Sequence, residues 1–99
     1  MKTITRTELK ELLDKGAPHT LIDVMPSEVY QAAHLPEAKN CCVYEVTFLD
    51  QVAAVAPRGT IVVYGSSGYS LASVTAQEKL TRAGYADVLN YRGGIEDWE

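Results

Sequence analysis

The loop after the most strongly β-branched run of the chain carries the residues best suited to chemistry. The run covers residues 60–64, and the loop covers residues 65–70. Glycine adopts positive φ angles that other residues avoid, so Gly65 and Gly68 would let the loop curl until its amide groups converge. The amino end of the helix that follows would add a positive field. Hydroxyl groups come from Ser66, Ser67 and Ser70. The loop therefore predicts a cradle for an anion of sulfate or phosphate size.

The same loop also has a purely structural interpretation. It would then be a tight turn from strand to helix whose serines cap the helix. No Gly-Lys-Ser/Thr follows, so it is not a Walker A loop, and the chain contains no G-x-G-x-x-G fingerprint. Tyr69 lies at the outer lip of the loop, where its ring would close the pocket or contact a partner. The alternative for Tyr69 is an ordinary surface tyrosine.

Cys41 and Cys42 are adjacent and are the two cysteines of the chain. Neighbours in sequence cannot close a long disulfide loop, and the pair lacks the spacing of a CxxC redox motif or a zinc knuckle. Two reduced thiols in a cytoplasmic protein are the simplest interpretation. If residues 38–42 are extended, the two side chains point to opposite faces, one into the core and the other toward the pocket of the 65–70 loop or toward solvent. We expect neither a metal ion nor a cofactor.

Strands and helices are predicted to alternate along the chain. The predicted strands are residues 2–5, 20–24, 38–42, 60–64 and 87–91. The predicted helices run from a cap at Thr5 or Thr7 to Gly16, and over residues 26–33, 44–56, 69–83 and 95–98. This alternation indicates a parallel α/β sheet, and the apolar run at 60–64 indicates helices on both of its faces. Ligands of such sheets bind at the carboxyl ends of the strands, where the 65–70 loop would lie.

Length, composition and charge narrow the function classes. The 99 residues are 46% hydrophobic and 22% charged, so we expect a single globular domain over residues 1–99. The net charge of −4, without a cluster of lysine and arginine, argues against nucleic acid and against an anionic membrane surface as partners. No apolar run approaches the roughly 18 residues that cross a bilayer. A small anion stays compatible with this charge, because a local nest of amides can bind one inside an acidic protein.

Several segments, in chain order, resemble single-domain rhodanese-like sulfurtransferases. Residues 21–30 are similar to the family segment L-I-D-V-R-x-x-x-E-Y, and residues 34–40 resemble H-I-P-G-A-x-N. Residues 61–64 resemble the strand that leads into the family's active-site loop. Residues 83–85 and 92–98 resemble its A-G-[FY] and x-G-G-I-x-x-W segments. This resemblance covers nearly the whole chain and implies a five-stranded, mainly parallel sheet in the order 1-5-4-2-3, flanked by helices on both faces.

The resemblance also implies a catalytic cysteine directly after the fourth strand, in a loop of the form C-x-x-G-x-[RS]. Its thiolate would accept sulfur from a donor such as thiosulfate as a persulfide and pass it to a nucleophile such as cyanide. Gly65 stands at that position, while Gly68 matches the glycine of the loop. Ser70 stands where many members carry arginine, and Met25 stands where the family usually has arginine after Asp-Val. The chain thus resembles inactive family members, which serve as binding or regulatory modules.

Three functional hypotheses follow. In the first, the 65–70 loop binds a thiosulfate- or sulfate-like anion or a protein partner without catalysis, and Asp23 caps the next helix or supports the loop. In the second, the protein is a sulfurtransferase or persulfide carrier that uses Cys41 or Cys42. In the third, Gly65 is a natural or engineered substitution in an active enzyme. The missing site arginine argues against the third hypothesis, since that hypothesis requires more than one change.

Overall fold

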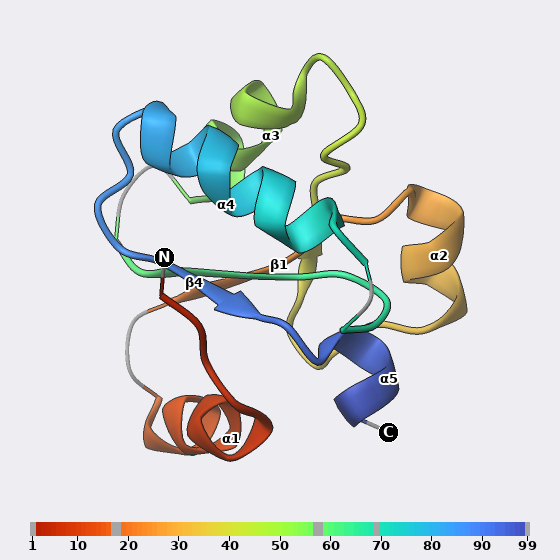
Figure 1. The fold of residues 1–99 in the computed structure, drawn as a ribbon, viewed down its shortest axis with the longest axis vertical. Helices are drawn as coiled ribbons and strands as arrows, with labels where there is room; N and C mark the ends of the chain where they lie inside the picture. The colour runs from red at the N-terminus through yellow and green to blue at the C-terminus, as the bar shows by residue number, and fades with distance from the viewer. Residues whose placement is uncertain (1, 17–18, 57–58, 69, 99) are drawn as a thin grey trace.

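A computed structural model of the chain describes residues 2–16, 19–56, 59–68 and 70–98. Its strands are β1 (Thr20–Asp23), β2 (Lys39–Asn40), β3 (Ile61–Tyr64) and β4 (Val88–Tyr91). Its helices are α1 (Arg6–Lys15), α2 (Ser27–Ala32), α3 (Phe48–Val55), α4 (Ala72–Arg82) and α5 (Gly94–Trp98). Strands and helices alternate as predicted, apart from α1 at the start (Figure 1).

The four strands form one parallel sheet in the order β2-β1-β3-β4. The register places Asp23, Tyr64 and Tyr91, the last residues of β1, β3 and β4, side by side. Because all strands run in the same direction, the segments that leave these residues emerge at one edge of the sheet. That edge is where the 65–70 loop begins.

The prediction of five strands in the order 1-5-4-2-3 was wrong. Residues 2–5 form no strand, and the segment meets β4 only through an isolated bridge between Thr3 and Asn90. The amide of Ile4 donates to the carbonyl of Asn90, and the amide of Asn90 donates to the carbonyl of Lys2. Thr5 already caps α1, so too few residues are left beside β4 for a ladder. The difference lies at this edge of the sheet.

Sequence signals for the ends of α1 are confirmed. Thr5 Oγ1 accepts from the Glu8 amide and the Glu8 carboxylate accepts from the Thr5 amide, which is a full capping box. Gly16 ends the helix with φ 64°. The predicted start of the next long helix at Tyr44 was wrong. Residues 43–47 form turns, and α3 begins only at Phe48.

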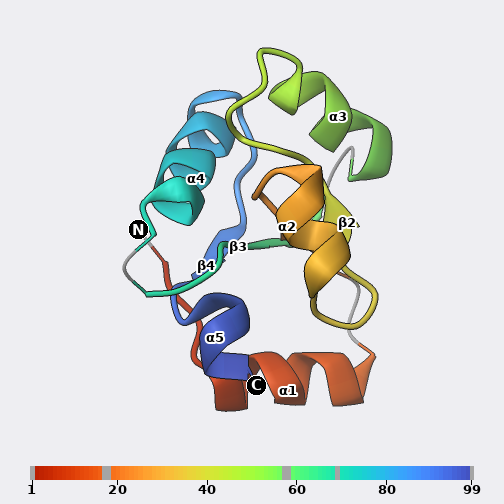
Figure 2. The ribbon, with the colours of Figure 1, turned by 90° about the vertical axis from the view of Figure 1, so that its right-hand side faces the viewer.

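Two apolar cores fill the faces of the sheet, which confirms helices on both sides. On one face, α3 and α4 pack residues such as Phe48, Val52 and Leu80 against the strands. On the other face, Leu9 of α1 packs with Leu21 of β1, and the partly buried Ile95 and Trp98 of α5 lie against this second cluster. Figure 2 shows α3 and α4 above the sheet and α1 and α5 below it. The helices therefore cover the sheet and leave its carboxyl edge to loops.

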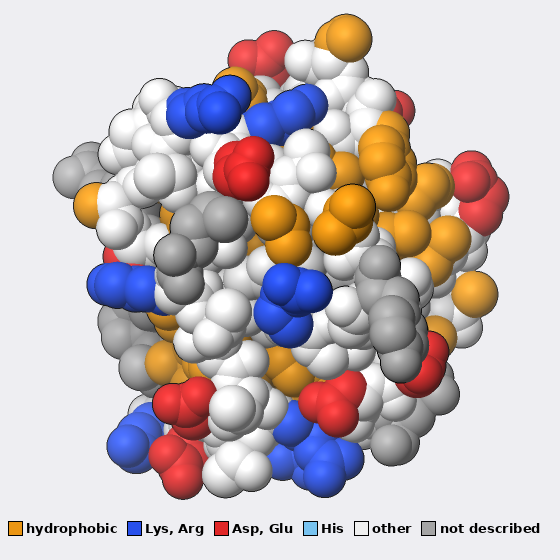
Figure 3. Space-filling view, in the orientation of Figure 1, with side chains coloured by type: hydrophobic (Ala, Val, Ile, Leu, Met, Phe, Trp, Pro, Cys, Tyr) orange, Lys and Arg blue, Asp and Glu red, His pale blue; other side chains and the backbone are white. Residues whose placement is uncertain are grey.

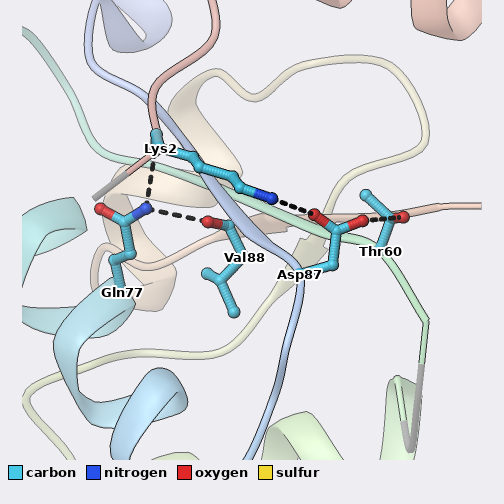
Figure 4. A network of polar contacts seen from close by, with 5 residues as sticks. All are labelled: Lys2, Thr60, Gln77, Asp87 and Val88. Carbon is cyan, nitrogen blue, oxygen red and sulfur yellow. Dashed lines mark hydrogen bonds and ion pairs between the residues drawn. The ribbon is translucent and has the colours of Figure 1, made fainter.

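A polar network ties the amino-terminal segment to the sheet (Figure 4). The side-chain amide of Gln77 donates to the carbonyls of Lys2, at 2.7 Å, and Val88, at 2.9 Å. Asp87 accepts from the Thr60 hydroxyl at 2.7 Å and lies 3.9 Å from the Lys2 ammonium. In the ranges described, no helix is long and apolar enough to cross a membrane, and no three His, Cys, Asp or Glu side chains gather to hold a metal ion.

Candidate functional site: the loop after β3

The loop begins where β3 leaves the core. All four residues of β3 are buried, and Gly65 directly after them is buried as well. Ser66, Ser67 and Ser70 are partly exposed, and Gly68 is exposed. The strand thus carries the loop from the interior to the surface at the carboxyl edge of the sheet, as the sequence predicted. Tyr69, predicted at the lip of this loop, lies outside the described residues.

Helix α5 holds the loop from one side. The Ile95 amide donates to the carbonyl of Gly65 at 3.1 Å, and the Glu96 amide donates to the carbonyl of Ser66 at 3.0 Å. In a trans peptide unit the N–H points opposite to the C=O. The amides of Ser66 and Ser67 are therefore directed away from α5, toward the other side of the loop. Backbone donors on that side are what an anion cradle requires.

Two further hydrogen bonds close the loop. The Ser67 carbonyl accepts from the Ser70 amide at 3.1 Å. The Gly68 carbonyl accepts from Nη2 of Arg92 at 3.2 Å. Ser70 Oγ in turn accepts from the Ala72 amide at 3.3 Å, at the start of α4. The N-cap of α4 is Leu71, which makes no side-chain cap bond, so the prediction that a serine of this loop caps the helix is met only by this one contact of Ser70 with the first residue of α4. The guanidinium of Arg92 lies at the rim of the loop.

The glycine angles differ from the expectation. Neither Gly65 nor Gly68 has a left-handed φ; Gly94 has one, at 68°. A Cβ at Gly94 would lie 2.5 Å from the Gly65 carbonyl oxygen, so only glycine fits there. The loop is shaped by its contact with α5 rather than by its own glycines. Arg92 and Gly94 are the residues that sequence reasoning missed as parts of the site, although a glycine pair such as Gly93-Gly94 signals close backbone approach.

Position 65 has room for a side chain. A Cβ built there would lie 3.2 Å from Ser70 Oγ and 3.6 Å from Met25 Sδ, and the backbone is not left-handed. A small shift of the Ser70 hydroxyl would therefore admit a residue such as serine or cysteine. Its side chain would lie between Met25 and Ser70, beside the loop.

Asp23 lies at the end of β1 and is 2% exposed. Its Oδ1 accepts from the Met25 amide at 2.9 Å and so holds the turn that leads into α2. Burial raises the pKa of the Asp23 carboxyl, against the opposing effects of the Met25 amide, the Tyr64 hydroxyl and His34. The structure places Asp23 under the turn that carries Met25, and its support of the loop itself stays a prediction.

Comparison with known proteins gives the family of this fold and loop. The sequence profile of the rhodanese-like domain matches residues 5–99. The chain belongs to the rhodanese-like family. Its fold, an α/β arrangement with a parallel sheet flanked by helices, is the rhodanese fold.

Related rhodanese-like sequences occur in larger proteins. The chain is 30% identical over 96 residues to a probable adenylyltransferase/sulfurtransferase MoeZ of Mycobacterium tuberculosis. The aligned region covers 97% of this chain and 24% of that protein. It is 33% identical over 95 residues to the HTH-type transcriptional regulator Rv0324 of the same species, with 96% and 40% covered. The chain therefore spans between about a quarter and two-fifths of the length of these relatives.

A solved structure described as rhodanese with anions from E. coli is also similar. Its sequence is 34% identical to this chain, and its TM-score is 0.69. The match covers 81% of this chain and 91% of that one. This chain is thus similar to most of the length of that rhodanese structure.

Both cysteines of this rhodanese-like domain are buried. Cys41 is 1% exposed within the core under α3 and α4, and burial raises the pKa of its thiol to about 11. Cys42 is 8% exposed and lines a hollow of about 300 Å³ with Pro26 and Glu45. Cys41 thus lies in the core, as expected of one of the two thiols. The hollow beside Cys42 is lined by no described residue of the 65–70 loop, so the expectation that the other thiol reaches the loop pocket or solvent is not met. The predicted strand over residues 38–42 was too long: β2 ends at Asn40, and both cysteines follow it.

Proposed function

We propose that this rhodanese-like domain binds a sulfate- or thiosulfate-like anion in the 65–70 loop and transfers no sulfur. One observation carries the proposal. Gly65 stands where the family resemblance implies cysteine, while the backbone of the loop is held in place by hydrogen bonds from α5. The carbonyls of Gly65 and Ser66 are engaged by α5. The N–H groups of the same peptide units point to the opposite side of the loop, where we place the anion.

Sulfur transfer needs a thiolate at this position. The thiolate would attack the outer sulfur of thiosulfate, form the enzyme persulfide and release sulfite. Cyanide would then take the outer sulfur as thiocyanate and regenerate the thiolate. Gly65 has no side chain, and the hydroxyls of Ser66 and Ser67 cannot hold a sulfane sulfur. The loop thus keeps binding groups and lacks a nucleophile.

The burial of Cys41 and Cys42 argues against a relocated sulfur carrier. A persulfide carrier must present a thiolate to two successive reactants, and reactive cysteines are exposed with lowered pKa values. Cys41 is the opposite case, buried and with a raised thiol pKa. Cys42 is also buried, although it borders a hollow. We therefore place the function at the loop.

The named relatives support a binding role. The similar structure is described as rhodanese with anions, which supports an anion as ligand of the loop. One relative is named a transcriptional regulator, which supports a regulatory module as one use of such a domain. The other is named a probable adenylyltransferase/sulfurtransferase, so sulfur transfer is the activity to test against.

The test is thiosulfate:cyanide sulfurtransfer by four proteins: native, Gly65→Cys, Gly65→Ser and Cys41→Ala/Cys42→Ala. We expect no thiocyanate above the buffer rate from the native chain and Gly65→Ser. Gly65→Cys should exceed Gly65→Ser by at least about a hundredfold, because the two side chains differ only in the sulfur. Its new thiol should also titrate below the ordinary value of about 8.5, since the loop amides favour the thiolate.

Native turnover that disappears in Cys41→Ala/Cys42→Ala would show that a buried cysteine carries sulfur. A new thiol titrating at or above about 8.5 would show that the amides are not arranged for an anion. Anion binding by the native chain is measured separately, as sulfate-dependent shifts of the backbone amide resonances of Ser66 and Gly68. If sulfate at millimolar concentration leaves both resonances unchanged, the anion site is wrong.

A further inference from the structure

A hollow of about 350 Å³ lies between α3 and the carboxyl-terminal half of α4, on the face opposite α1. It is lined by Glu45, Val46, Phe48, Leu49, Lys79, Arg82 and Ala83. None of these residues belongs to the 65–70 loop. Figure 3 shows basic side chains together with apolar and acidic ones over the upper end of the molecule, where Figure 1 places α3 and α4.

The hollow has an exposed apolar wall. Val46 is fully exposed and Leu49 is 40% exposed, while Phe48 beside them is buried. Covering apolar surface is favourable by roughly 25 cal/mol per Å². Grouped exposed apolar side chains around a depression, rimmed by charge, are typical of a surface that contacts another protein.

The opposite wall is basic. Lys79 and Arg82 lie three residues apart on α4 and so project from one side of that helix. Lys79 Nζ lies 3.5 Å from the carbonyl oxygen of Val43, so the ammonium leans across to the segment before α3. Within the described ranges, neither cation forms an ion pair with a carboxylate. Lys79 and Arg82 thus bring two positive charges to one hollow of a protein whose net charge is −4.

The carboxylate in the lining does not neutralise these cations. Oε1 of Glu45 accepts from Nε2 of Gln51 at 2.8 Å, and Gln51 also donates to the Thr47 hydroxyl. Glu45 is thus bonded to Gln51 of α3, and within the described ranges it forms no ion pair with Lys79 or Arg82. The lining thus combines exposed apolar side chains with two cations that, among the described residues, form no ion pair.

We propose that this hollow, lined by residues 45–49 and 79–83, docks an acidic segment of a partner protein that also carries apolar side chains. An apolar side chain of the partner would enter beside Leu49, and its carboxylates would pair with Lys79 and Arg82. Complementary charge at such a rim gives specificity and faster association. A second copy of this acidic chain is the less favourable occupant, because two bodies of charge −4 repel each other.

The probe is a fluorescein-labelled synthetic peptide of about fifteen residues with leucines at helical spacing flanked by glutamates. Its control is the same peptide with lysine in place of every glutamate. We expect the acidic peptide to bind at least tenfold more tightly, and its affinity to fall as salt rises from 50 to 500 mM. Fluorescence anisotropy measures both.

Variants locate the binding. Lys79→Glu/Arg82→Glu should weaken the acidic peptide at least tenfold, and Leu49→Ser should weaken it severalfold. Lys10→Glu/Lys15→Glu makes the same charge change on α1, against the other face, and should leave the affinity unchanged. Lys79, Arg82 and the two control lysines are exposed, so circular dichroism should show unaltered folding in both charge variants.

Three results would overturn the proposal. One is absence of binding by the acidic peptide, or equal binding of both peptides. Another is unchanged affinity in Lys79→Glu/Arg82→Glu. The last is a concentration-dependent dimer in sedimentation equilibrium that Val46→Ser abolishes, which would make a second copy the occupant.

Discussion

At the scale of single residues, two positions lie at the carboxyl edge of the sheet: one has no side chain and the other has a buried carboxyl group. Gly65 brings no thiol to the position where the family resemblance implies the catalytic cysteine. Asp23 places an ionisable carboxyl where water is nearly absent, and Oδ1 of this carboxyl accepts from the Met25 amide in the next turn. A buried carboxylate of this kind affects stability even where it takes no part in binding.

The raised pKa of Asp23 predicts a specific pH dependence of stability. The folded state binds the proton of this carboxyl more tightly than the unfolded state, whose pKa is about 3.8. Its contribution to the free energy of unfolding is therefore complete below the unfolded pKa and is lost as pH rises through the folded pKa. Asp23→Asn keeps an oxygen for the Met25 amide and removes the titration.

Urea unfolding of both proteins at several pH values from 3 to 7 measures this effect. The stability of Asp23→Asn relative to the native chain should increase with pH above 3.8. Other carboxyl groups contribute equally to both proteins and cancel in the difference. A difference that is constant across this range, or that decreases, would mean that burial does not dominate the environment of Asp23.

At the scale of elements, α5 shapes the loop although it is only five residues long. It begins at Gly94, two residues beyond Arg92 and three beyond Tyr91, the last residue of β4. Tyr91 Oη donates to Asp97 Oδ2 at 2.7 Å, and Arg6 Nη1 donates to the Asp97 carbonyl at 3.1 Å. These contacts join α5 to β4 and α1. The first amides of α5 are then in place to hold the carbonyls of residues 65 and 66.

Gly94→Ala tests the contact between α5 and the loop. Its φ of 68° costs an alanine roughly 1 kcal/mol, and its Cβ would meet the Gly65 carbonyl oxygen at 2.5 Å. Overpacking adds about 1–3 kcal/mol, so we expect a total loss of roughly 2–4 kcal/mol in denaturant unfolding. Amide resonances of Ser66 and Ser67 should also shift.

Gly16→Ala is the matched control for this backbone effect. Gly16 has a similar φ of 64°, and a Cβ there would meet nothing within 4 Å. Its loss should stay near 1 kcal/mol, without shifts in the loop. Equal losses in the two variants would mean that the approach of α5 to the loop is not tight.

At the scale of the whole molecule, the amino-terminal segment is joined to the sheet mainly by polar groups rather than by a ladder. Gln77 is 2% exposed and its side chain bridges α4, the start of β4 and Lys2 (Figure 4). Both carbonyls that it bonds lose this donor if the side chain is truncated. The network thus joins residues 2–5 to the sheet in place of the strand that these residues do not form.

Gln77→Ala should therefore destabilise the protein by about 1–3 kcal/mol, because the carbonyl of the buried Val88 loses this donor. Hydrogen exchange of the Ile4 and Asn90 amides, which bond across this join, should speed up. Glu78→Ala, next to it on the exposed side of α4, should change stability by no more than about 0.5 kcal/mol. If the two variants unfold alike, the bridge contributes nothing measurable.

Local signals in the sequence were enough for much of this molecule. The β-branched run of β3, the capping box at Thr5 and the glycine at position 16 each act over a few residues, so their structures are encoded where they stand. Alternating strands and helices, together with the family resemblance, predicted a parallel sheet with the loop at its carboxyl edge. The residue at position 65 determined, without any structure, that no thiol stands there.

Contacts between distant segments decided the rest. Whether residues 2–5 form a strand depends on competition between pairing with β4 and capping of α1 by Thr5. The path of the loop depends on Gly94, nearly thirty residues later, because the amides of α5 hold its carbonyls. The burial of Cys41 and Cys42, and the hollow between α3 and α4, likewise arise only when separate helices pack on one sheet. Sequence periodicity encodes which face of an element is apolar, and tertiary packing decides what that face meets.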